Sequence, residues 1–422
     1  MKRKSVLLAL AFVIAVGGAS AGAVGAAAAH PNAVITWNGI MLSAFATAAL
    51  PPPIAIRAGA IVQASVFDAV NGIDPQYTSI HVAPAGPQEA SRQAAAAGAA
   101  YTALVTLFQS QKPTLDADLA ASLAAMEDES NSAVAEGVAW GEAVAGQILA
   151  WRAGDGFNSV LPPYVQGTAP GDWQPTPGGI GAPKFRTLTV TAPFAMTSPS
   201  EFRPAGPPAL TSSQYAAAVN EVEAYGSATS TVRTPFQTET AKFWQLDTPV
   251  AMWDRVADSL AEAHHFNLMH SARLLALLNL AQADAIIAVF DAKNAFNFWR
   301  PVTAIQQAAL DGNPDTTPDP SWTSLLIVPY FQEYPSAHSG VSSAATAVLA
   351  AVFGNDTQFT VTSGGLPGVD RSFNTFSDAV AQVANARVWA GFHFRFSVVD
   401  GTRLGTQVGQ LADSTLMQRL GD

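Results

Sequence analysis

The sequence YPSAHSG at residues 334–340 predicts a helix that begins at an anion-binding site. Ser336 fits the N-cap position, where a hydroxyl accepts a hydrogen bond from the first turn. The free N–H groups of that turn and the positive end of the helix dipole favour an anion, and His338 would lie at the mouth of the site. The small residues at 341–345 let neighbouring helices approach closely. The alternative is a structural histidine that only caps the helix.

Outward from this stretch, helical patterning dominates the sequence. Alanine-rich or apolar periodicity predicts helices over residues 54–70, 88–107, 115–126, 130–152, 212–225, 239–244, 250–265, 272–298, 336–352, 376–391 and 403–419. Only residues 358–362 and the alternating residues 186–191 favour strands. The predicted fold class is therefore all-α, with helical bundles and minimal β structure.

The chain is expected to have three parts. Residues 1–29 combine a basic start, an apolar stretch and small residues, which is typical of a secretory signal peptide. Residues 30–208 are expected to form an N-terminal helical layer followed by a Pro- and Gly-rich connector. Residues 209–422 are expected to form a C-terminal helical bundle that carries the chemistry. These features predict a secreted or periplasmic protein, and polar residues within its most apolar later segment argue against a stable membrane span.

The composition excludes several kinds of partner and chemistry. The 32 acidic residues outnumber the 21 basic ones, and an acidic surface repels nucleic acid, so no nucleic-acid partner is expected. The chain contains no cysteine, which excludes disulfides, thiolate nucleophiles, iron–sulfur clusters and cysteine-type zinc sites. The composition leaves the oligomeric state open.

Two cations occur in the sequence KNAFNFWRP at residues 293–301. Lys293 and Arg300 are seven residues apart, which is about two helical turns, so a continuous helix would project both from one face. Two cations among aromatic residues are costly unless an anion lies between them. Pro301 limits how far such a helix can continue. The alternative is a pair of surface cations whose aliphatic stems lie along apolar surface.

A further arginine and histidine occur in the sequence RVWAGFHF at residues 387–394. Arg387 and His393 are six residues apart, about 120° from a common helical face, so they converge only through the reach of the arginine or a break near Gly391. Together the three segments supply the lysine, arginine, serine and backbone donors that an oxyanion needs. The two histidines add one ligand or nucleophile and one acid/base group.

The three segments resemble the signature of the vanadium-dependent haloperoxidase and type-2 phosphatidic acid phosphatase superfamily, in particular its bacterial haloperoxidase-like members. That signature reads Lys-x6-Arg-Pro, Pro-Ser-Gly-His and Ser-Arg-x5-His-x3-Asp, and the chain matches it in order and spacing. Three positions depart from it. Ala337 replaces a glycine, Ala386 replaces a serine, and Ser397 replaces an aspartate that would orient His393. Asp400 is a candidate substitute, although it lies three residues out of register.

The resemblance implies a vanadate cofactor, or phosphate in the same site, and neither haem nor a nucleotide. His393 would bind the vanadium, and the oxygens would be held by Lys293, Arg300, Ser336, the Ala337 N–H and Arg387. His338 would act as the acid/base group, and Lys293 would polarise the bound peroxide. The small-molecule substrates would be hydrogen peroxide and a halide, which is oxidised to hypohalous acid.

The resemblance also singles out two residues near the expected site. Phe331 falls where the family varies between phenylalanine and histidine, and it favours the chloroperoxidase-like type. Asp247 is expected to pair with His338, with an aspartate that merely ends a helix or forms a turn as the alternative.

Two other functions stay open at this point. An acid phosphatase would use the same residues on a phosphate ester, with a phosphohistidine at His393 and His338 protonating the leaving group. A non-catalytic oxyanion-binding protein would not require both histidines. The chain length and the N-terminal helical layer favour the haloperoxidase, and so does Ser397, because losing a carboxylate weakens a nucleophilic histidine more than a ligating one.

Overall fold

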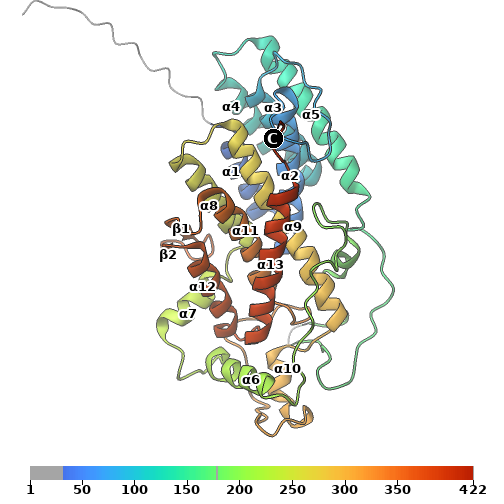
Figure 1. Ribbon diagram of the computed structural model, residues 1–422, viewed down its shortest axis with the longest axis vertical. Helices are drawn as coiled ribbons and strands as arrows, with labels where there is room; N and C mark the ends of the chain where they lie inside the picture. The colour runs from blue at the N-terminus through green and yellow to red at the C-terminus, as the bar shows by residue number, and fades with distance from the viewer. Residues whose placement is uncertain (1–31, 177–178, 422) are drawn as a thin grey trace, which may run out of the picture. The chain divides into compact units, whose positions relative to one another are not determined.

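The computed structural model describes residues 32–176 and 179–421, which fold as helices joined by long loops (Figure 1). The first part contains α1 (Ala33–Thr47), α2 (Pro52–Ile73), α3 (Arg92–Leu107), α4 (Lys112–Ala124), α5 (Asn131–Ala153) and the short 3-10 helices η1 (Gln109–Gln111) and η2 (Arg186–Val190). The later part contains α6 (Ser213–Gly226), α7 (Pro235–Phe243), α8 (Pro249–Ala263), α9 (Leu268–Phe296), α10 (Pro301–Gln306), η3 (Ala308–Leu310), α11 (Ala337–Phe353), α12 (Phe376–Trp389) and α13 (Arg395–Thr415). The antiparallel strands β1 (Phe359–Thr362) and β2 (Asp370–Phe373) form the one sheet among the described residues. The all-α prediction is confirmed.

The predicted signal peptide, residues 1–29, lies outside the described residues. The described residues pack as one compact unit. The division between residues 208 and 209 stays a prediction, since helices from both parts contact each other within this unit.

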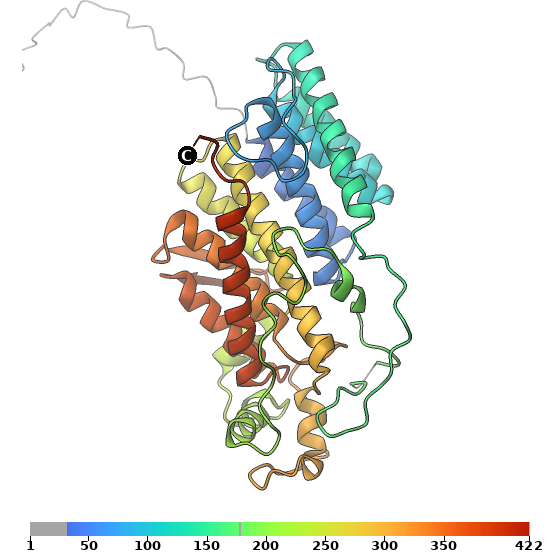
Figure 2. The ribbon, with the colours of Figure 1, turned by 45° about the vertical axis from the view of Figure 1, so that its right-hand side comes forward.

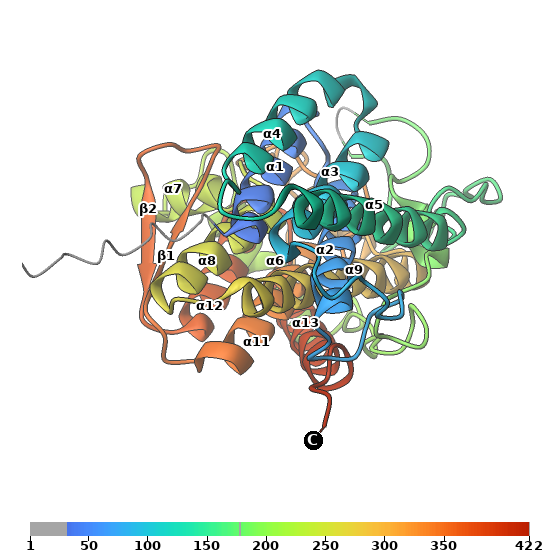
Figure 3. The ribbon, with the colours of Figure 1, turned by 90° about the horizontal axis from the view of Figure 1, so that it is seen from above.

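Helix α9 is the central element of the unit. It is 29 residues long, and almost every side chain between Met269 and Lys293 is buried. The helices that pack against it include α2, α8, α11 and α13. Figure 2 shows α13 running beside α9, and Figure 3, a view from above, shows α9 surrounded by other helices. This packing holds the C-terminal end of α9 in place.

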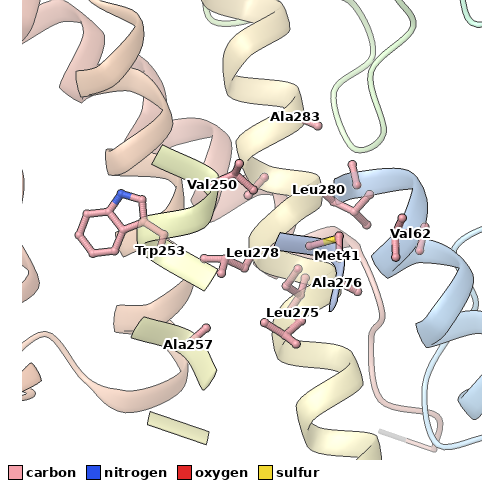
Figure 4. Close-up of a cluster of buried hydrophobic side chains, with 14 of the residues drawn as sticks. Met41, Val62, Val250, Trp253, Ala257, Leu275, Ala276, Leu278, Leu280 and Ala283 are labelled. Atoms are coloured by element: carbon pink, nitrogen blue, oxygen red, sulfur yellow. The ribbon is translucent and has the colours of Figure 1, made fainter. Parts of the chain in front are cut away.

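Apolar side chains fix α9 to its neighbours (Figure 4). Leu278 lies toward Trp253 of α8, and Leu280 lies toward Val62 of α2; all four side chains are buried. Burying a leucine or valine side chain contributes about 1.5–3 kcal/mol relative to leaving it exposed. The apolar character of the segment is therefore explained by burial in the protein.

Two helices, α2 and α9, are long and apolar enough to cross a membrane by length and composition. Of their most apolar windows, 89% and 100% respectively is buried inside the protein. Helices at the centre of a helical core have this same composition. Their hydropathy is thus accounted for by the contacts that they make within the fold.

Helices α11 and α13 pack closely through small residues. A Cβ atom added at Gly405 would lie 1.9 Å from the carbonyl oxygen of Gly340, and one added at Gly401 would lie 2.6 Å from that of Ser336. The Ser336 N–H also donates a hydrogen bond of 3.1 Å to the carbonyl oxygen of Ser397. The expectation that small residues after His338 permit close helix approach is confirmed, and the contact holds the first turn of α11 in place.

We expect Gly405→Ala to lower the free energy of unfolding by about 3 kcal/mol, because its methyl group meets the backbone of α11 and the helices must separate. Gly146→Ala is the matched control, since nothing lies within 4 Å of an added Cβ at this position of α5. The control should raise the free energy of unfolding by about 0.5–1 kcal/mol, the ordinary gain for alanine in a helix. Urea unfolding of both variants checks the prediction, and equal effects would contradict it.

The predicted helices and strands do not include α1, α10 or β2, and others differ in their bounds, among them α9, residues 186–191 and α13. Helix α9 ends at Phe296, because Asn297 adopts a left-handed conformation with φ 45°. The predicted strand over residues 186–191 is instead η2, which packs against α9 with no neighbouring strand to pair with. Helix α13 begins at Arg395, eight residues before the predicted start. The end of α9 at Phe296 matters for the site.

Candidate functional site: a buried oxyanion pocket

The residues of the three motifs lie at the ends of five helices. Lys293 is in the last turn of α9, Arg300 is the N-cap residue of α10, and Ser336 is the N-cap residue of α11. Arg387 is in the last turn of α12, and His393 lies in the short connection between α12 and α13. All five side chains are at most 2% exposed. The N-terminal end of α11 suits an anion because it offers unpaired N–H groups and a positive partial charge, and the side-chain cations of Lys293 and Arg387 come from C-terminal ends.

The prediction that Lys293 and Arg300 project from one face of a continuous helix is wrong. The left-handed Asn297 ends α9, and Pro301 starts α10. The two cations nevertheless come together, since the ring of Phe331 lies 5.3 Å from Lys293 Nζ and 4.9 Å from Arg300 Cζ. The turn between α9 and α10 brings the two side chains together, although they are not on one helix.

The predicted break near Gly391 is confirmed. Helix α12 ends at Trp389, and Gly391 has φ 80°, a conformation that favours glycine. A Cβ atom at this position would also lie 2.6 Å from the carbonyl oxygen of Gly226. The turn brings His393 back toward the last turn of α12, where Arg387 is located.

Arg387 has more unpaired N–H donors than the other cations of the site, counted among the described residues. Its side chain is fully buried, and its Nε and both Nη atoms have no hydrogen-bond acceptor among the described residues. Buried guanidinium groups are normally paired, because an unpaired buried charge is strongly unfavourable. Three unpaired donors on one planar fork match the geometry of an oxyanion.

Arg300 is partly anchored and partly free. Its Nε donates to the carbonyl oxygen of Phe331 at 2.8 Å, and one Nη donates to that of Phe392 at 3.0 Å. The second Nη is buried without an acceptor among the described residues. The backbone contacts hold the guanidinium group in place and leave one edge for a ligand.

Lys293 makes two defined hydrogen bonds. Its Nζ donates to the carbonyl oxygens of Gln332 and Glu333, each at 2.8 Å. An ammonium group has three N–H donors, so one remains for a ligand. The same contacts tie the loop before α11 to the end of α9, which positions Glu333 as well.

The first turn of α11 provides further donors. Ser336 caps the helix through hydrogen bonds with Ser339, and the N–H groups of Ala337 and His338 have no acceptor among the described residues. Nε2 of His338 is likewise buried without a partner there. Ala337, which replaces the glycine of the motif that the sequence resembles, thus keeps an unpaired N–H.

His393 is oriented by a carboxylate that the sequence analysis did not identify. Its Nδ1 lies 2.8 Å from Oε1 of Glu333, which also accepts the N–H of Phe394 at 3.1 Å. Because a carboxylate accepts, Nδ1 carries the proton and Nε2 keeps its lone pair. Nε2 lies 3.4 Å from an Nη atom of Arg300, on the side of the cations. This tautomer suits a histidine that binds or attacks an oxyanion centre.

The structure corrects two expectations about the surrounding carboxylates. Asp400, the suggested substitute for the aspartate missing at Ser397, accepts from the Tyr334 hydroxyl at 2.6 Å and pairs with Arg403. Ser397 itself contacts Nδ1 of His393 only weakly, at 3.4 Å. The carboxylate nearest to the imidazole belongs to Glu333, which lies in the segment before α11.

Asp247 makes other contacts than the expected one with His338. Its carboxylate accepts from the guanidinium group of Arg255 and from the N–H groups of Thr248 and Gly364. These three donors satisfy the carboxylate at the start of α8. The alternative interpretation, an aspartate in a turn beside a helix, describes it better.

Burial and mutual repulsion shift the titration of the whole cluster. Burial, and next the charge of Arg300, lowers the pKa of Arg387 to about 9. Burial, and next Arg387, Lys293 and Arg300, holds the pKa of His338 well below its usual range. The pKa of Lys293 is lowered in the same way. A bound anion would relieve each of these shifts, since it supplies the opposite charge.

The pKa of Glu333 moves in the opposite direction. Burial raises it to about 7, against the lowering effects of Lys293 and Arg300. Oε2 of Glu333 is buried without a partner among the described residues. The other carboxylate oxygen, Oε1, makes the hydrogen bonds with His393 and Phe394.

The residues present fit vanadate or phosphate. Both ions need several convergent donors around a tetrahedral or trigonal-bipyramidal centre, and the pocket offers unpaired donors on Arg387, Arg300 and the first turn of α11. His393 Nε2 faces the same group. The charges of Lys293, Arg300 and Arg387 act on both His338 and His393, so these residues lie close together. Phe331 covers Lys293 and Arg300, whereas Asp247 contacts none of these residues among the described hydrogen bonds and ion pairs.

Comparisons with known proteins agree with this geometry. Residues 273–422 match the model of the VCPO second helical-bundle domain. A vanadium chloroperoxidase from Curvularia inaequalis is 30% identical over 202 residues, which cover 39% of this chain and 32% of that relative's length. The matched region thus spans about a third of the relative.

Solved structures extend the similarity to most of the fold. A bacterial vanadium-dependent iodoperoxidase superimposes with a TM-score of 0.80 and 25% identity, covering 92% of this chain and 97% of that chain. A bacterial vanadium-dependent chloroperoxidase in its holo form superimposes with a TM-score of 0.71 and 20% identity, covering 92% and 96%. Residues 273–422 are therefore similar to the VCPO second helical-bundle domain, and the chain has the fold of the vanadium-dependent haloperoxidases.

Proposed function

We propose that this chain is a vanadate-dependent haloperoxidase, which oxidises a halide with hydrogen peroxide. The observation that carries the proposal is the set of buried donors without acceptors among the described residues, above all the three guanidinium nitrogens of Arg387. They belong to a cluster with His393, whose Nε2 lies 3.4 Å from an Nη atom of Arg300. Buried donors are normally paired with protein, water or a ligand, and three unpaired nitrogens on one buried guanidinium group favour a bound oxyanion. The similarity to vanadium haloperoxidases supports vanadate as that ligand.

The cations of the pocket would bind the oxyanion, and His338 would transfer protons. Bound vanadate would act as a Lewis acid that activates hydrogen peroxide. Arg387, Arg300 and Lys293 neutralise the charge of the oxyanion, and Lys293 directs its remaining N–H toward it. His338 is neutral at neutral pH because its pKa is lowered, so its free Nε2 can accept a proton from hydrogen peroxide and return it to the leaving oxygen.

The proposal also concerns which halide the protein oxidises. The named relatives are a chloroperoxidase and an iodoperoxidase, so they do not decide between halides. Phe331 covers Lys293 and Arg300 with its ring, which lowers the polarity beside these two cations. We therefore propose that Phe331 influences the halide preference, with chloroperoxidase-like selectivity as the expectation.

An acid phosphatase is the second candidate, and one observation favours it. Glu333 supplies the carboxylate partner that Ser397 lacks, so His393 is as well oriented for attack on phosphorus as for ligation. The absence of a carboxylate at Ser397 therefore does not exclude a phosphohistidine at His393. Both candidates predict the same pocket and differ in the assay.

The decisive experiment compares the two activities in one preparation. The purified protein is reconstituted with orthovanadate and supplied with hydrogen peroxide and chloride, bromide or iodide, and halogenation of a phenolic dye is followed. Hydrolysis of an aryl phosphate without vanadate is measured in parallel. We expect vanadate-dependent halogenation that is lost in His338→Ala and His393→Ala. Strong phosphatase activity without halogenation would reverse the assignment, and activity unchanged in both variants would favour an unrelated site.

We also propose secretion or a periplasmic location, on the composition of residues 1–29 alone. Expression in the native host followed by N-terminal sequencing tests this. A mature N-terminus between residues 20 and 31 in the exported fraction supports it. An uncleaved chain confined to the cytoplasm contradicts it.

A further inference from the structure

A group of buried polar atoms around Glu333 has no hydrogen-bond partner among the described residues. It consists of Oη of Tyr215, Nε1 of Trp299 and Oε2 of Glu333, and all three side chains are fully buried. Oε2 belongs to the carboxylate whose other oxygen contacts Nδ1 of His393. Buried polar atoms are normally satisfied by protein or by ordered water, so two donors and one acceptor without partners require an explanation.

The packing places Tyr215 beside the residues that hold Glu333. The ring of Tyr215, on α6, is centred 6.4 Å from the ring of Phe298 and 6.0 Å from that of Phe394. The Glu333 N–H donates to the carbonyl oxygen of Phe298 at 3.0 Å, and Oε1 accepts the N–H of Phe394 at 3.1 Å. Trp299 directly follows Phe298 in the chain. Tyr215 thus packs against both backbone partners of Glu333.

The charges around the phenol agree with this placement. Burial, and next the charge of Asp311, raises the pKa of Tyr215. The side chain of Trp299 lowers this pKa, and the charge of Glu333 raises it further. The indole of Trp299 and both carboxylates are therefore close enough to act on the hydroxyl of Tyr215.

The two carboxylates near Tyr215 differ in how well they are satisfied. Oδ1 of Asp311 accepts the N–H of Asn313 at 2.8 Å, and Oδ2 accepts the hydroxyl of Thr316 at 2.8 Å. Oε2 of Glu333 has no donor among the described residues. A buried carboxylate oxygen without a donor carries the full cost of losing its water, so Glu333 is the carboxylate that needs the hydroxyl of Tyr215.

We propose that one buried water molecule connects Tyr215 and Trp299 to Oε2 of Glu333. Tyr215 is thereby a positioning residue for the carboxylate that orients His393. The water accepts the O–H of Tyr215 and the N–H of Trp299, and it donates to Oε2. About three hydrogen bonds are usual for a buried water, and each atom of the group then has a partner. Only the last step, in which the oriented His393 binds vanadate, rests on the proposed function.

The first test measures the melting temperature of Tyr215→Phe, which removes the hydroxyl and keeps the ring. Removing a buried hydroxyl that has no partner should leave the melting temperature unchanged or raise it. We expect instead a decrease of about 2–5 °C, because the substitution removes a hydrogen bond that supports a buried carboxylate. An unchanged or raised melting temperature would overturn the proposal.

The second test is nitrogen NMR of labelled histidine in the protein without vanadate, which reports on positioning directly. Tyr215→Phe should shift the Nδ1 resonance of His393 in the direction that Glu333→Ala shifts it, and by a smaller amount. Tyr334→Phe is the matched buried control, since its hydroxyl donates to Asp400 at 2.6 Å, and it should leave the resonance in place. A resonance that does not move in Tyr215→Phe, or that moves equally in Tyr334→Phe, would contradict the proposal.

The third test identifies the carboxylate on which Tyr215 acts. The change in melting temperature caused by Tyr215→Phe is measured again in the Glu333→Ala and Asp311→Asn backgrounds. Residues that share a hydrogen-bond network are not additive, so the change should fall to less than about half in Glu333→Ala. It should stay at its full size in Asp311→Asn. The opposite pattern would assign the hydroxyl to Asp311 and overturn the proposal.

Orthovanadate affinity connects this positioning to the site. Tyr215→Phe should weaken binding by about 2–10-fold, the equivalent of one hydrogen bond, and unchanged affinity would contradict a role in the oxyanion site. The two proposals can fail separately. If the effects on His393 occur but the reconstituted protein does not halogenate, the haloperoxidase function fails and the positioning of Glu333 stands. If halogenation occurs while Tyr215→Phe changes neither His393 nor the melting temperature, the positioning role alone fails.

Discussion

Arg387→Met is expected to lower the affinity for orthovanadate at least about a hundredfold while making the ligand-free protein more stable. The guanidinium group is fully buried, and none of its three nitrogens has an acceptor among the described residues. Losing one donor to a developing oxyanion costs about 2.7–4 kcal/mol, or 10²–10³-fold, in enzymes of other kinds. Replacing an uncompensated buried charge by an apolar side chain of similar length should raise the melting temperature.

The measurement combines calorimetric titration with thermal unfolding. Orthovanadate should raise the melting temperature of the unaltered protein, because it binds the folded state alone, and should leave that of Arg387→Met unchanged. Arg92→Met is the matched control, since Arg92 pairs with Asp74 on the surface, where both side chains are about half exposed. This control should bind orthovanadate normally. A destabilised Arg387→Met variant with normal affinity would contradict the role of Arg387.

Glu333→Ala is expected to lower orthovanadate affinity by about 10–100-fold, the usual effect of removing a partner that orients a metal-bound histidine. The substitution removes the acceptor of both the His393 Nδ1–H and the Phe394 N–H, at 2.8 and 3.1 Å. The imidazole can then change its tautomer or rotate, and Nε2 no longer faces the cations reliably. Glu333→Gln should have a smaller effect, because the amide oxygen can still accept from Nδ1.

Nitrogen NMR of labelled histidine distinguishes orientation from simple loss of structure. The Nδ1–H tautomer of His393 should dominate in the unaltered protein and in Glu333→Gln, and a mixture should appear in Glu333→Ala. Asp400→Asn is the control, since Asp400 contacts Tyr334 and Arg403 and not the imidazole. If Asp400→Asn reduced affinity as much as Glu333→Ala, the assignment of the orienting carboxylate would be wrong.

Much of the fold could be predicted from the sequence, because its signals are local. Alanine-rich periodicity and cap residues predicted α2, α3 and α5 to within a few residues. The predicted N-cap Ser336 and the predicted break near Gly391 are both found in the structure. Residues 186–191 were predicted wrongly because alternation in a short segment is ambiguous, and packing against α9 gives a 3-10 helix.

The site residues within local motifs could likewise be predicted, whereas a partner distant in the sequence could not. The cations and both histidines could be predicted because the three motifs are distinctive in type and spacing. Glu333 could not be identified by spacing from His393, since it is 60 residues earlier in the chain and approaches through tertiary structure. One local signal was present: Glu333 is the lone charged residue within the otherwise uncharged stretch 327–337, directly before the Tyr334-Pro335-Ser336 motif. A buried charge in such a stretch requires a partner.

The most direct test of the account is a crystal structure of the protein grown with orthovanadate. The account predicts one vanadate whose metal lies within bonding distance of His393 Nε2, with the Arg387 fork and the free Nη of Arg300 donating to its oxygens. The Glu333 carboxylate should remain on Nδ1. Vanadate bound elsewhere, or a pocket in which Arg387 turns away to another partner, would contradict the central claim.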